Sequence, residues 1–187
     1  MKNDKTNKVI ARVAPSPTGY LHIGTARVAL FNFLFAKKYG GTFILRIDDT
    51  DKERSKKEYE ENIIDSLLWL GLSWNLIYKQ SERTDIYKKY LKKLVDEGKA
   101  YISKEKIKKE GDREEVIRFR NPNKKIGFAD LVRGNIEFDT TDLGDFVIAK
   151  SLEEPLYHLA TVVDDFEMGI THVIRGEDHI SNTPRQI

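Results

Sequence analysis

Residues 12–25 read Arg12-Val-Ala-Pro-Ser-Pro-Thr-Gly-Tyr-Leu-His-Ile-Gly-Thr25, a turn with two prolines and two glycines between two apolar runs. The run before the turn, residues 9–14, is short and rich in β-formers, and Pro15 and Pro17 end it. After the turn, apolar residues recur at helical spacing until Gly40. The stretch therefore predicts a strand, a tight turn and a helix that begins near Gly24.

The start of this helix is suited to bind phosphate. Its first N–H groups are free and its dipole end is positive, and Gly24 lets the backbone approach a ligand closely. His22 would lie beside the phosphate, where it could donate a hydrogen bond to charge that develops in a transition state. The alternative interpretation is a Pro/Gly turn with a structural histidine, which would be preferred for an isolated His-x-Gly.

The composition indicates an ordinary globular protein of one large domain or two small ones. The chain has 187 residues, a net charge of +2 and no cysteine. Disulfides and cysteine-based zinc sites are therefore excluded, which is compatible with a reducing cytoplasm. Residues 1–8 lack the apolar core of a signal peptide, and no apolar run has the length of a membrane span. We expect a cytoplasmic protein.

The pattern of the first hundred residues predicts an α/β fold. Residues 42–47 form a second β-type run directly after Gly41, and strand, helix and strand in about forty residues favour a parallel sheet. Ser55 and Glu58 match a capping box for the next helix. That helix would end at Gly71 and bury Tyr59, Ile63, Leu67 and Leu70. A further helix at 84–97 would end at Gly98 and bury Ile86, Tyr87, Tyr90, Leu91, Leu94 and Val95.

The composition then changes: residues 104–115 are highly charged, and short β-type runs follow them. This pattern predicts an inserted α+β module. The β-type runs are 116–120, 135–138 and 146–149, and after them come a helical segment at 159–163, a strand at 171–174 and a helix that Thr183 and Pro184 open. We therefore expect three segments: 1–98, the first half of a nucleotide-binding domain; 99–155, the insertion; and 156–187, a return to the first domain.

Two polar motifs follow predicted strands. Asp48 lies at the carboxyl end of the second strand, where open α/β sheets bind ligands, and could receive an ammonium group. Arg175 ends the strand at 171–174 and offers a planar fork that suits a carboxylate. The loop after it could contact ribose and adenine. The alternatives are an acidic loop that caps a helix and a salt-bridged loop.

Five segments together, 12–25, 46–51, 162–165, 172–179 and 181–186, resemble in order and spacing the bacterial-type glutamyl-tRNA synthetases of class I. The resemblance implies a Rossmann-type catalytic domain that joins L-glutamate to ATP, with Mg²⁺, as glutamyl-adenylate and then transfers the glutamyl group to tRNA(Glu). It also implies that the insertion receives the tRNA acceptor end, that the full-length enzyme is a monomer, and that the protein itself holds no metal.

By position, the resemblance assigns residues to each substrate. His22 and Thr25 would be catalytic. The glutamate site would comprise Arg12, Ala14, Ser16, Asp48, Tyr157, Thr161 and Arg175. The ATP site would comprise His22, Gly24, Thr25, Glu177, Asp178 and His179.

The sequence departs from the family pattern at several places. Thr25 replaces the usual histidine or glycine, Asp48 replaces glutamate, and Leu152-Glu153 replaces an Asp-Gly turn. No zinc is expected, because the cysteine-bearing module is absent. The lysine-serine signature loop and the anticodon-binding domain should lie beyond Ile187, so we expect an N-terminal catalytic portion that is inactive or weakly active alone.

Two other functions remain open at this point. One is the stand-alone glutamyl-queuosine tRNA(Asp) synthetase, and the other is a non-catalytic paralogue that binds tRNA ends or a protein partner. The presence of Arg12, His22, Asp48, Tyr157 and Arg175 argues against a decayed site. The lysine-rich segment 88–109 could follow a phosphate backbone or could be a solvated helix face.

Overall fold

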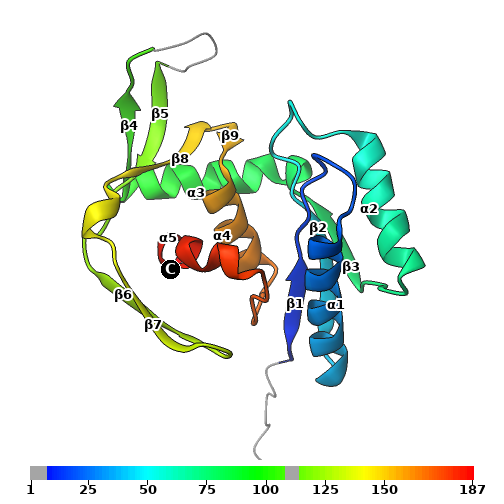
Figure 1. Ribbon diagram of the computed structural model, residues 1–187. Coiled ribbons are helices and arrows are strands. Elements are labelled where there is room, and N and C mark those ends of the chain that lie inside the picture. The colour runs from blue at the N-terminus through cyan, green and yellow to red at the C-terminus, as the bar shows by residue number, and fades with distance from the viewer. Residues whose placement is uncertain (1–7, 108–113) are drawn as a thin grey trace, which may run out of the picture. The chain divides into compact units, whose positions relative to one another are not determined.

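The computed structural model describes residues 8–107 and 114–187, which form two compact units (Figure 1). The first unit contains the described chain up to Arg83 together with Asp165–Glu177. The second contains the described residues of Thr84–Asp164 and Asp178–Ile187. Each unit has its own hydrophobic core and is described by itself.

The first unit is built on a parallel sheet of three strands in the order β1-β2-β3. Helix α1 (Ile23–Lys38) connects β1 (Ile10–Val13) to β2 (Thr42–Ile47), and α2 (Lys57–Trp69) connects β2 to β3 (Leu76–Lys79). The predicted α/β class and parallel sheet are therefore confirmed.

A glycine allows the chain before β2 to approach the chain before β1. The backbone N–H of Thr42 donates to the carbonyl of Val9 at 2.7 Å, just before the ladder of β1 and β2 begins. A Cβ on Gly41 would lie 2.3 Å from that same carbonyl oxygen. No side chain fits there, so Gly41 is required for the two strands to meet.

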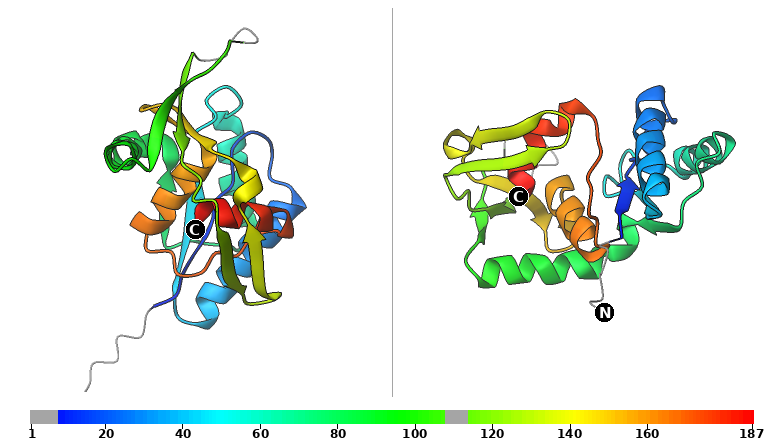
Figure 2. Two further views of the ribbon diagram at one scale, coloured as in Figure 1. Left: turned by 90° about the vertical axis from the view of Figure 1, so that its left-hand side faces the viewer. Right: turned by 90° about the horizontal axis from the view of Figure 1, so that it is seen from below.

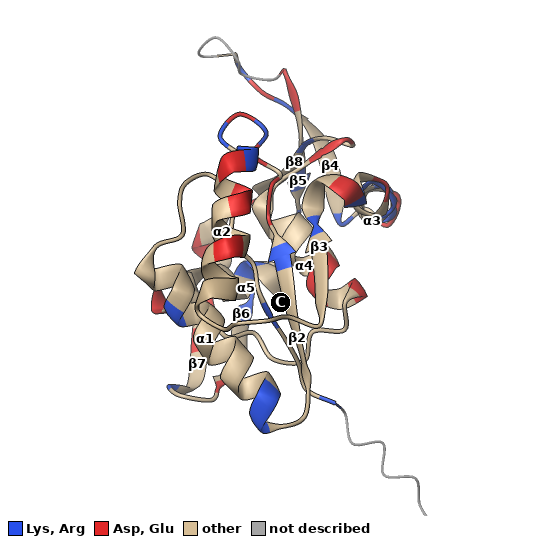
Figure 3. Ribbon diagram, turned by 90° about the vertical axis from the view of Figure 1, so that its right-hand side faces the viewer, with Lys and Arg blue, Asp and Glu red and all other residues tan. Residues whose placement is uncertain are grey.

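One apolar core joins both helices to the sheet. Small side chains let α1 lie close to the strands, and Ile63 and Leu67 bring in α2. The buried set is Ala11, Val13, Ala29, Ala36, Phe43, Leu45, Ile47, Ile63, Leu67 and Leu72. The other face of α1 is apolar as well, since Leu30, Phe31 and Leu34 are exposed. Figure 3 shows this helix largely without charged residues.

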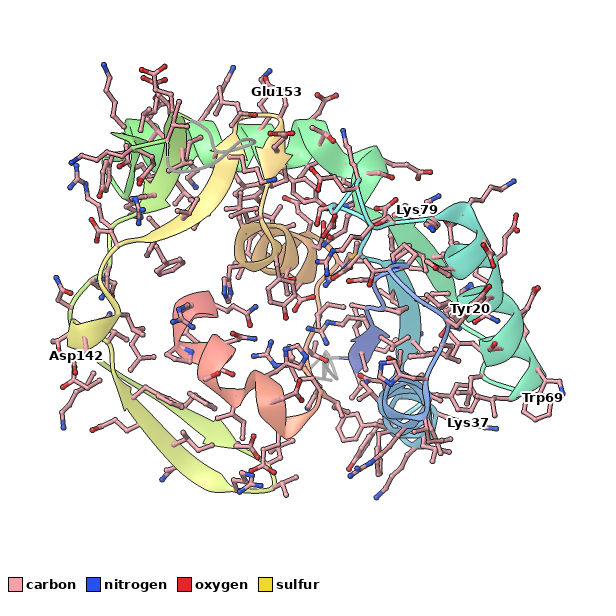
Figure 4. All side chains as sticks on the ribbon, turned by 45° about the horizontal axis from the view of Figure 1, so that its top comes forward. Tyr20, Lys37, Trp69, Lys79, Asp142 and Glu153 are labelled. Atoms are coloured by element: carbon pink, nitrogen blue, oxygen red, sulfur yellow. The ribbon has the colours of Figure 1, made fainter. Side chains whose placement is uncertain are left out.

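The predicted capping box was wrong. Helix α2 begins at Lys57 after Lys56, with no side-chain cap. The turn runs one residue further than expected, because the N–H of Lys56 donates to the carbonyl of Pro17 at 3.0 Å. Glu58 accepts instead from the hydroxyl of Tyr20, which lies beside α2 in Figure 4.

Two other local predictions were wrong. Leu70 is 44% exposed, because the helix ends at Trp69 and the chain turns at Gly71, whose φ is +74°. The strand expected at 171–174 is reduced to an isolated bridge between His172 and Ala11. The N–H groups of Thr171 and His172 both donate to the carbonyl of Ile10, so no regular ladder continues.

The second unit contains an antiparallel sheet in the order β4-β5-β8-β9 and a separate hairpin of β6 and β7. Helix α3 (Thr84–Asp96) precedes the sheet, and α4 (Tyr157–Glu167) and the short α5 (Thr183–Gln186) follow it. The strands are β4 (Ala100–Lys104), β5 (Glu115–Phe119), β6 (Lys125–Asp130), β7 (Gly134–Asp139), β8 (Phe146–Ser151) and β9 (Glu154–Pro155).

The core of this unit lies between α3, α4 and the sheet. The predicted stripe of α3 is confirmed: Tyr87 and Leu91 are buried, and the other members pack against them. The Tyr87 hydroxyl donates to the buried carboxylate of Asp164 at 2.8 Å. The buried apolar residues are Tyr87, Leu91, Ala100, Ile117, Ile148, Ala149, Leu159, Ala160 and Val163.

The hairpin of β6 and β7 is closed at its base by side chains, and Figure 2 shows it as a yellow-green two-stranded ribbon. Asn121 donates to the carbonyl of Thr140, and the Thr140 hydroxyl accepts from the N–H of Lys124 at 3.0 Å. The ladder within the hairpin runs from Lys125 opposite Asp139 to Asp130 opposite Gly134.

The two units are divided differently from the three predicted segments. Helix α3, most of α4 and Asp178–Ile187 group with the antiparallel strands, whereas the sequence placed α3 in the first segment and 156–187 in the third. The division into 1–98, 99–155 and 156–187 stays a prediction.

Two adjacent leucines of α2 test the core of the first unit. Leu67 is fully buried and Leu68 is 51% exposed. Leu67→Ala should lower the free energy of unfolding by about 2–5 kcal/mol, because it leaves a cavity. Leu68→Ala should change it by less than about 1 kcal/mol. Urea titrations of both variants make the comparison, and equal losses would contradict the assigned core.

Candidate functional site

His22 caps the N-terminus of α1. Its Nδ1 accepts from the N–H of Gly24 at 3.2 Å, and its Nε2 lies 3.1 Å from the hydroxyl of Thr25. Because Nδ1 is an acceptor, the neutral ring carries its proton on Nε2 and donates to Thr25. A Cβ on Gly24 would lie 2.9 Å from the ring, so a side chain there would displace His22.

A cavity of about 260 Å³ lies beside this cap. Its walls come from the turn after β1, from the start of α1 and from Ile63 of α2. The lining residues are Pro15, Ser16, Thr18, Gly19, Tyr20, Leu21, His22, Thr25 and Ile63. Since the imidazole of His22 is exposed, it is open to a ligand.

The turn that forms this cavity is fixed to its neighbours by hydrogen bonds. The carbonyl of Pro15 accepts from the N–H of Asp48 at 2.9 Å, and the Asn62 side chain accepts from the N–H of Leu21 at 3.0 Å. The hydrogen bond from Tyr20 to Glu58 adds a third link, and that carboxylate raises the pKa of Tyr20. The backbone around the cavity is therefore held from β2 and from α2.

Four charged side chains form one network at the carboxyl ends of β1 and β2. The carboxylate of Asp165 accepts from Nε and Nη2 of Arg12, at 3.0 and 2.9 Å, and from Nη1 of Arg46 at 2.7 Å. Arg46 also donates to both oxygens of Asp48, at 2.6 and 3.1 Å. Arg12, Arg46 and Asp48 are buried, and the side chain of Asp165 is 18% exposed. With two charges of each sign, the network is neutral.

The electrostatics of Asp165 follow from its two partners. Burial acts to raise the pKa of the carboxyl, but the charges and hydrogen bonds of Arg12 and Arg46 outweigh it and hold the pKa below its usual value. Asp165 is therefore ionised at neutral pH. The sequence assigned roles to Arg12 and Asp48. Asp165 lies in the matching segment 162–165 but received no role, because its partners are 153 and 119 residues away.

A buried polar residue of α1 positions the backbone before Arg175. The side chain of Asn32 donates to the carbonyl of Ile174 at 2.9 Å and is itself fully buried. Asn32 is the polar residue in an otherwise apolar stretch, Leu30-Phe-Asn-Phe-Leu34, which is the signal that sequence reasoning overlooked.

The second unit contains the other predicted residues. The Tyr157 hydroxyl lies 3.4 Å from Nδ1 of His179, and Nε2 of His179 lies 3.5 Å from a carboxylate oxygen of Asp178. Thr161 is 3% exposed, and in the described part of the chain its hydroxyl has no hydrogen-bond partner. A buried hydroxyl without a partner costs free energy that a hydrogen bond would recover.

The predicted site residues thus fall into two groups. The first unit holds Arg12, Ala14, Ser16, His22, Gly24, Thr25, Asp48, Arg175 and Glu177. The second unit holds Tyr157, Thr161, Asp178 and His179. Within residues 8–107 and 114–187, no three His, Asp or Glu side chains are grouped so that they could hold a metal ion. In the same residues no helix has the length and apolar character needed to cross a membrane.

Residues 8–110 and 102–187 match the sequence model of the family described as tRNA synthetases class I (E and Q), catalytic domain. The chain belongs to this family. The resemblance carried by the five segments is thereby confirmed, and so is the class of fold that it implied.

The most similar relatives include glutamate–tRNA ligases. The chain is 49% identical to that of Aquifex aeolicus (strain VF5), over 97% of this chain and 46% of the relative. It is 50% identical to glutamate–tRNA ligase 1 of Petrotoga mobilis, over 94% and 43%. Among solved structures, a glutamate tRNA ligase from Elizabethkingia meningosepticum, crystallised in complex with its amino acid, has a TM-score of 0.89 at 34% identity, over 96% and 46%. The chain spans a little less than half the length of these relatives.

The Asp165 network predicts how stability depends on pH. Since the pKa of this carboxyl is lower in the folded protein than in the unfolded chain, its contribution is complete above about pH 4 and is lost as the pH falls through the folded value. At pH 7, Asp165→Asn should lower the free energy of unfolding by about 3 kcal/mol. Below pH 4 the gap between the two proteins should narrow. Urea titrations at several pH values measure it, and a constant gap down to pH 3 would contradict the assignment.

Proposed function

We propose that the protein containing this chain ligates L-glutamate to tRNA(Glu) in two steps, through a glutamyl-adenylate formed from ATP. The observation that carries this proposal is the near 50% identity, along almost the whole chain, to relatives named glutamate–tRNA ligase. The place of action would be the cytoplasm, where translation occurs.

The N-terminus of α1 would receive the phosphates of ATP. The Nε2–H of His22 donates to the Thr25 hydroxyl in this structure and would turn to a phosphate when ATP binds, and backbone N–H groups of the first turn would add further donors. Charge on the attacked α-phosphate grows in the transition state, so a donor at this place stabilises that state more than bound ATP. Mg²⁺ would enter with ATP, as part of the substrate.

The neutral ion network would form the floor of the glutamate site. Arg12 would bind one carboxylate and Arg175 the other, while Asp48 would attract the ammonium group. Both oxygens of Asp48 accept from Arg46. Ala14 and Ser16 of the first unit would belong to the same site. The roles of Tyr157 and Thr161, which lie in the second unit, rest on the resemblance to the family.

The antiparallel module of the second unit would receive the acceptor end of the tRNA. The lysines of α3 are weaker support for this role, because Lys88 pairs with Glu153 and Lys93 with Glu97. The shallow hollow along α3 mixes four lysines with three acidic residues. Both earlier interpretations of the lysine segment stay open for residues 88–107, and residues 108 and 109 lie outside the described chain.

Charging assays test the proposal against its two alternatives. The product of the complete reading frame should catalyse glutamate-dependent exchange between pyrophosphate and ATP and should charge tRNA(Glu). Charging of tRNA(Asp) alone would support the glutamyl-queuosine enzyme. A protein that binds tRNA without any exchange would support the non-catalytic paralogue.

His22 should act on the transition state. His22→Ala should lower the rate of adenylate formation about 100-fold, which corresponds to about 2.7 kcal/mol, with little change in the Kd of ATP. His172→Ala, a histidine outside the cavity, is the matched control. Single-turnover rates and equilibrium binding separate the two effects. A large loss of ATP affinity with an intact rate would make His22 a binding residue instead.

A further inference from the structure

Asp165 is an ionised, largely buried group to which the reaction as proposed gives no task. It lies in the last turn of α4 and contacts arginines of two adjacent strands, Arg12 of β1 and Arg46 of β2. All three belong to the first unit. A carboxylate in this place neutralises one of two buried guanidinium groups. The geometry of its hydrogen bonds also restricts the orientation of Arg12.

The carboxylate occupies one particular edge of Arg12. A guanidinium can hold a carboxylate at its side, through Nε and Nη2, or at its end, through Nη1 and Nη2. Asp165 takes the side edge with two parallel bonds of 3.0 and 2.9 Å. Such a pair fixes the plane of the guanidinium as well as its position. In the described chain, Nη1 of Arg12 has no hydrogen-bond partner, so the end edge stays available.

Asp165 is itself held in one orientation. Its Oδ1, which accepts from Nε of Arg12, also accepts from Nη1 of Arg46 at 2.7 Å. Arg46 is in turn held by both oxygens of Asp48. The chain of bonds from Asp48 to Arg12 therefore leaves the guanidinium of Arg12 little freedom to turn.

We propose that Asp165 is a positioning residue, which holds the side edge of Arg12 so that its end edge faces a carboxylate of the amino acid substrate. This inference rests on the proposed function, in which Arg12 binds glutamate. Asp165 would not contact the substrate. Its effect would be to lower the entropy that Arg12 loses when the substrate binds.

The test compares two neighbouring aspartates in the product of the complete reading frame. Asp165→Asn should raise the KM for glutamate at least 10-fold in pyrophosphate exchange, with kcat and the KM for ATP within about threefold. If charge alone mattered, the same variant would lower the KM for glutamate, because the network becomes more positive. Asp164→Asn is the control, since Asp164 is buried on the same helix but is bonded to Tyr87; it should leave the KM for glutamate unchanged. An unchanged or lower KM in Asp165→Asn would overturn the inference.

A double-mutant cycle separates positioning from a general loss of structure. Lysine has no planar fork, so in the Arg12→Lys background Asp165→Asn should change the KM for glutamate by less than about twofold. An equal rise in both backgrounds would assign Asp165 a structural role and overturn the inference. If thermal melts show Asp165→Asn to be unfolded, Asp165→Glu takes its place in the cycle, with a smaller rise that again requires Arg12. Absence of glutamate-dependent exchange in the unaltered protein would instead reject the proposed function.

Discussion

The carboxylate of Asp165, shared by Arg12 and Arg46, is the constraint on which the first unit depends. Two guanidinium groups buried side by side repel each other, and burying either one alone is costly. The carboxylate resolves both problems, and it ties the last turn of α4 to the ends of two parallel strands. Asp48 completes a neutral set of four. Loss of one member would leave a buried charge without compensation, so the stability of each side chain depends on the other three.

The turn between β1 and α1 is held in place by residues next to this network. The N–H of Asp48 holds the carbonyl of Pro15, and the N–H of Lys56 holds that of Pro17. Hydrogen bonds thus fix the backbone between β1 and α1 at Pro15, where it leaves the sheet, and at Pro17, near the middle of the turn. His22 then closes the turn by capping α1 and by meeting the hydroxyl of Thr25. Polar side chains that are exposed but rigidly held are what a site for a charged substrate requires.

Sequence reasoning succeeded where a local pattern decides the outcome. Strand β2, which follows two glycines, was placed at its observed bounds, and the apolar stripe of α3 was read from its period. It failed where the deciding partner is remote. The capping box at Ser55 did not form, because the N–H of Lys56 donates to Pro17 and Tyr20 donates to the carboxylate of Glu58. Strand β3 was not predicted, because its four residues show neither an alternating pattern nor full burial. Of the candidate site, most residues came from family motifs. Asp165 also lies in a motif, but its role, like that of Asn32, becomes visible only through contacts across more than a hundred residues.

The hairpin of β6 and β7 has an evolutionary consequence. Its ladder closes on itself, and Asn121, Lys124 and Thr140 fasten its base. Residues added or removed in opposite pairs along the two strands would leave that fastening, and the ladder of the neighbouring sheet, unchanged. The hairpin is therefore a part of the described chain whose length can vary at little cost in stability. Changes in the sequence and length of the hairpin can therefore alter the surface of the second unit without changing the ion network that supports the parallel sheet.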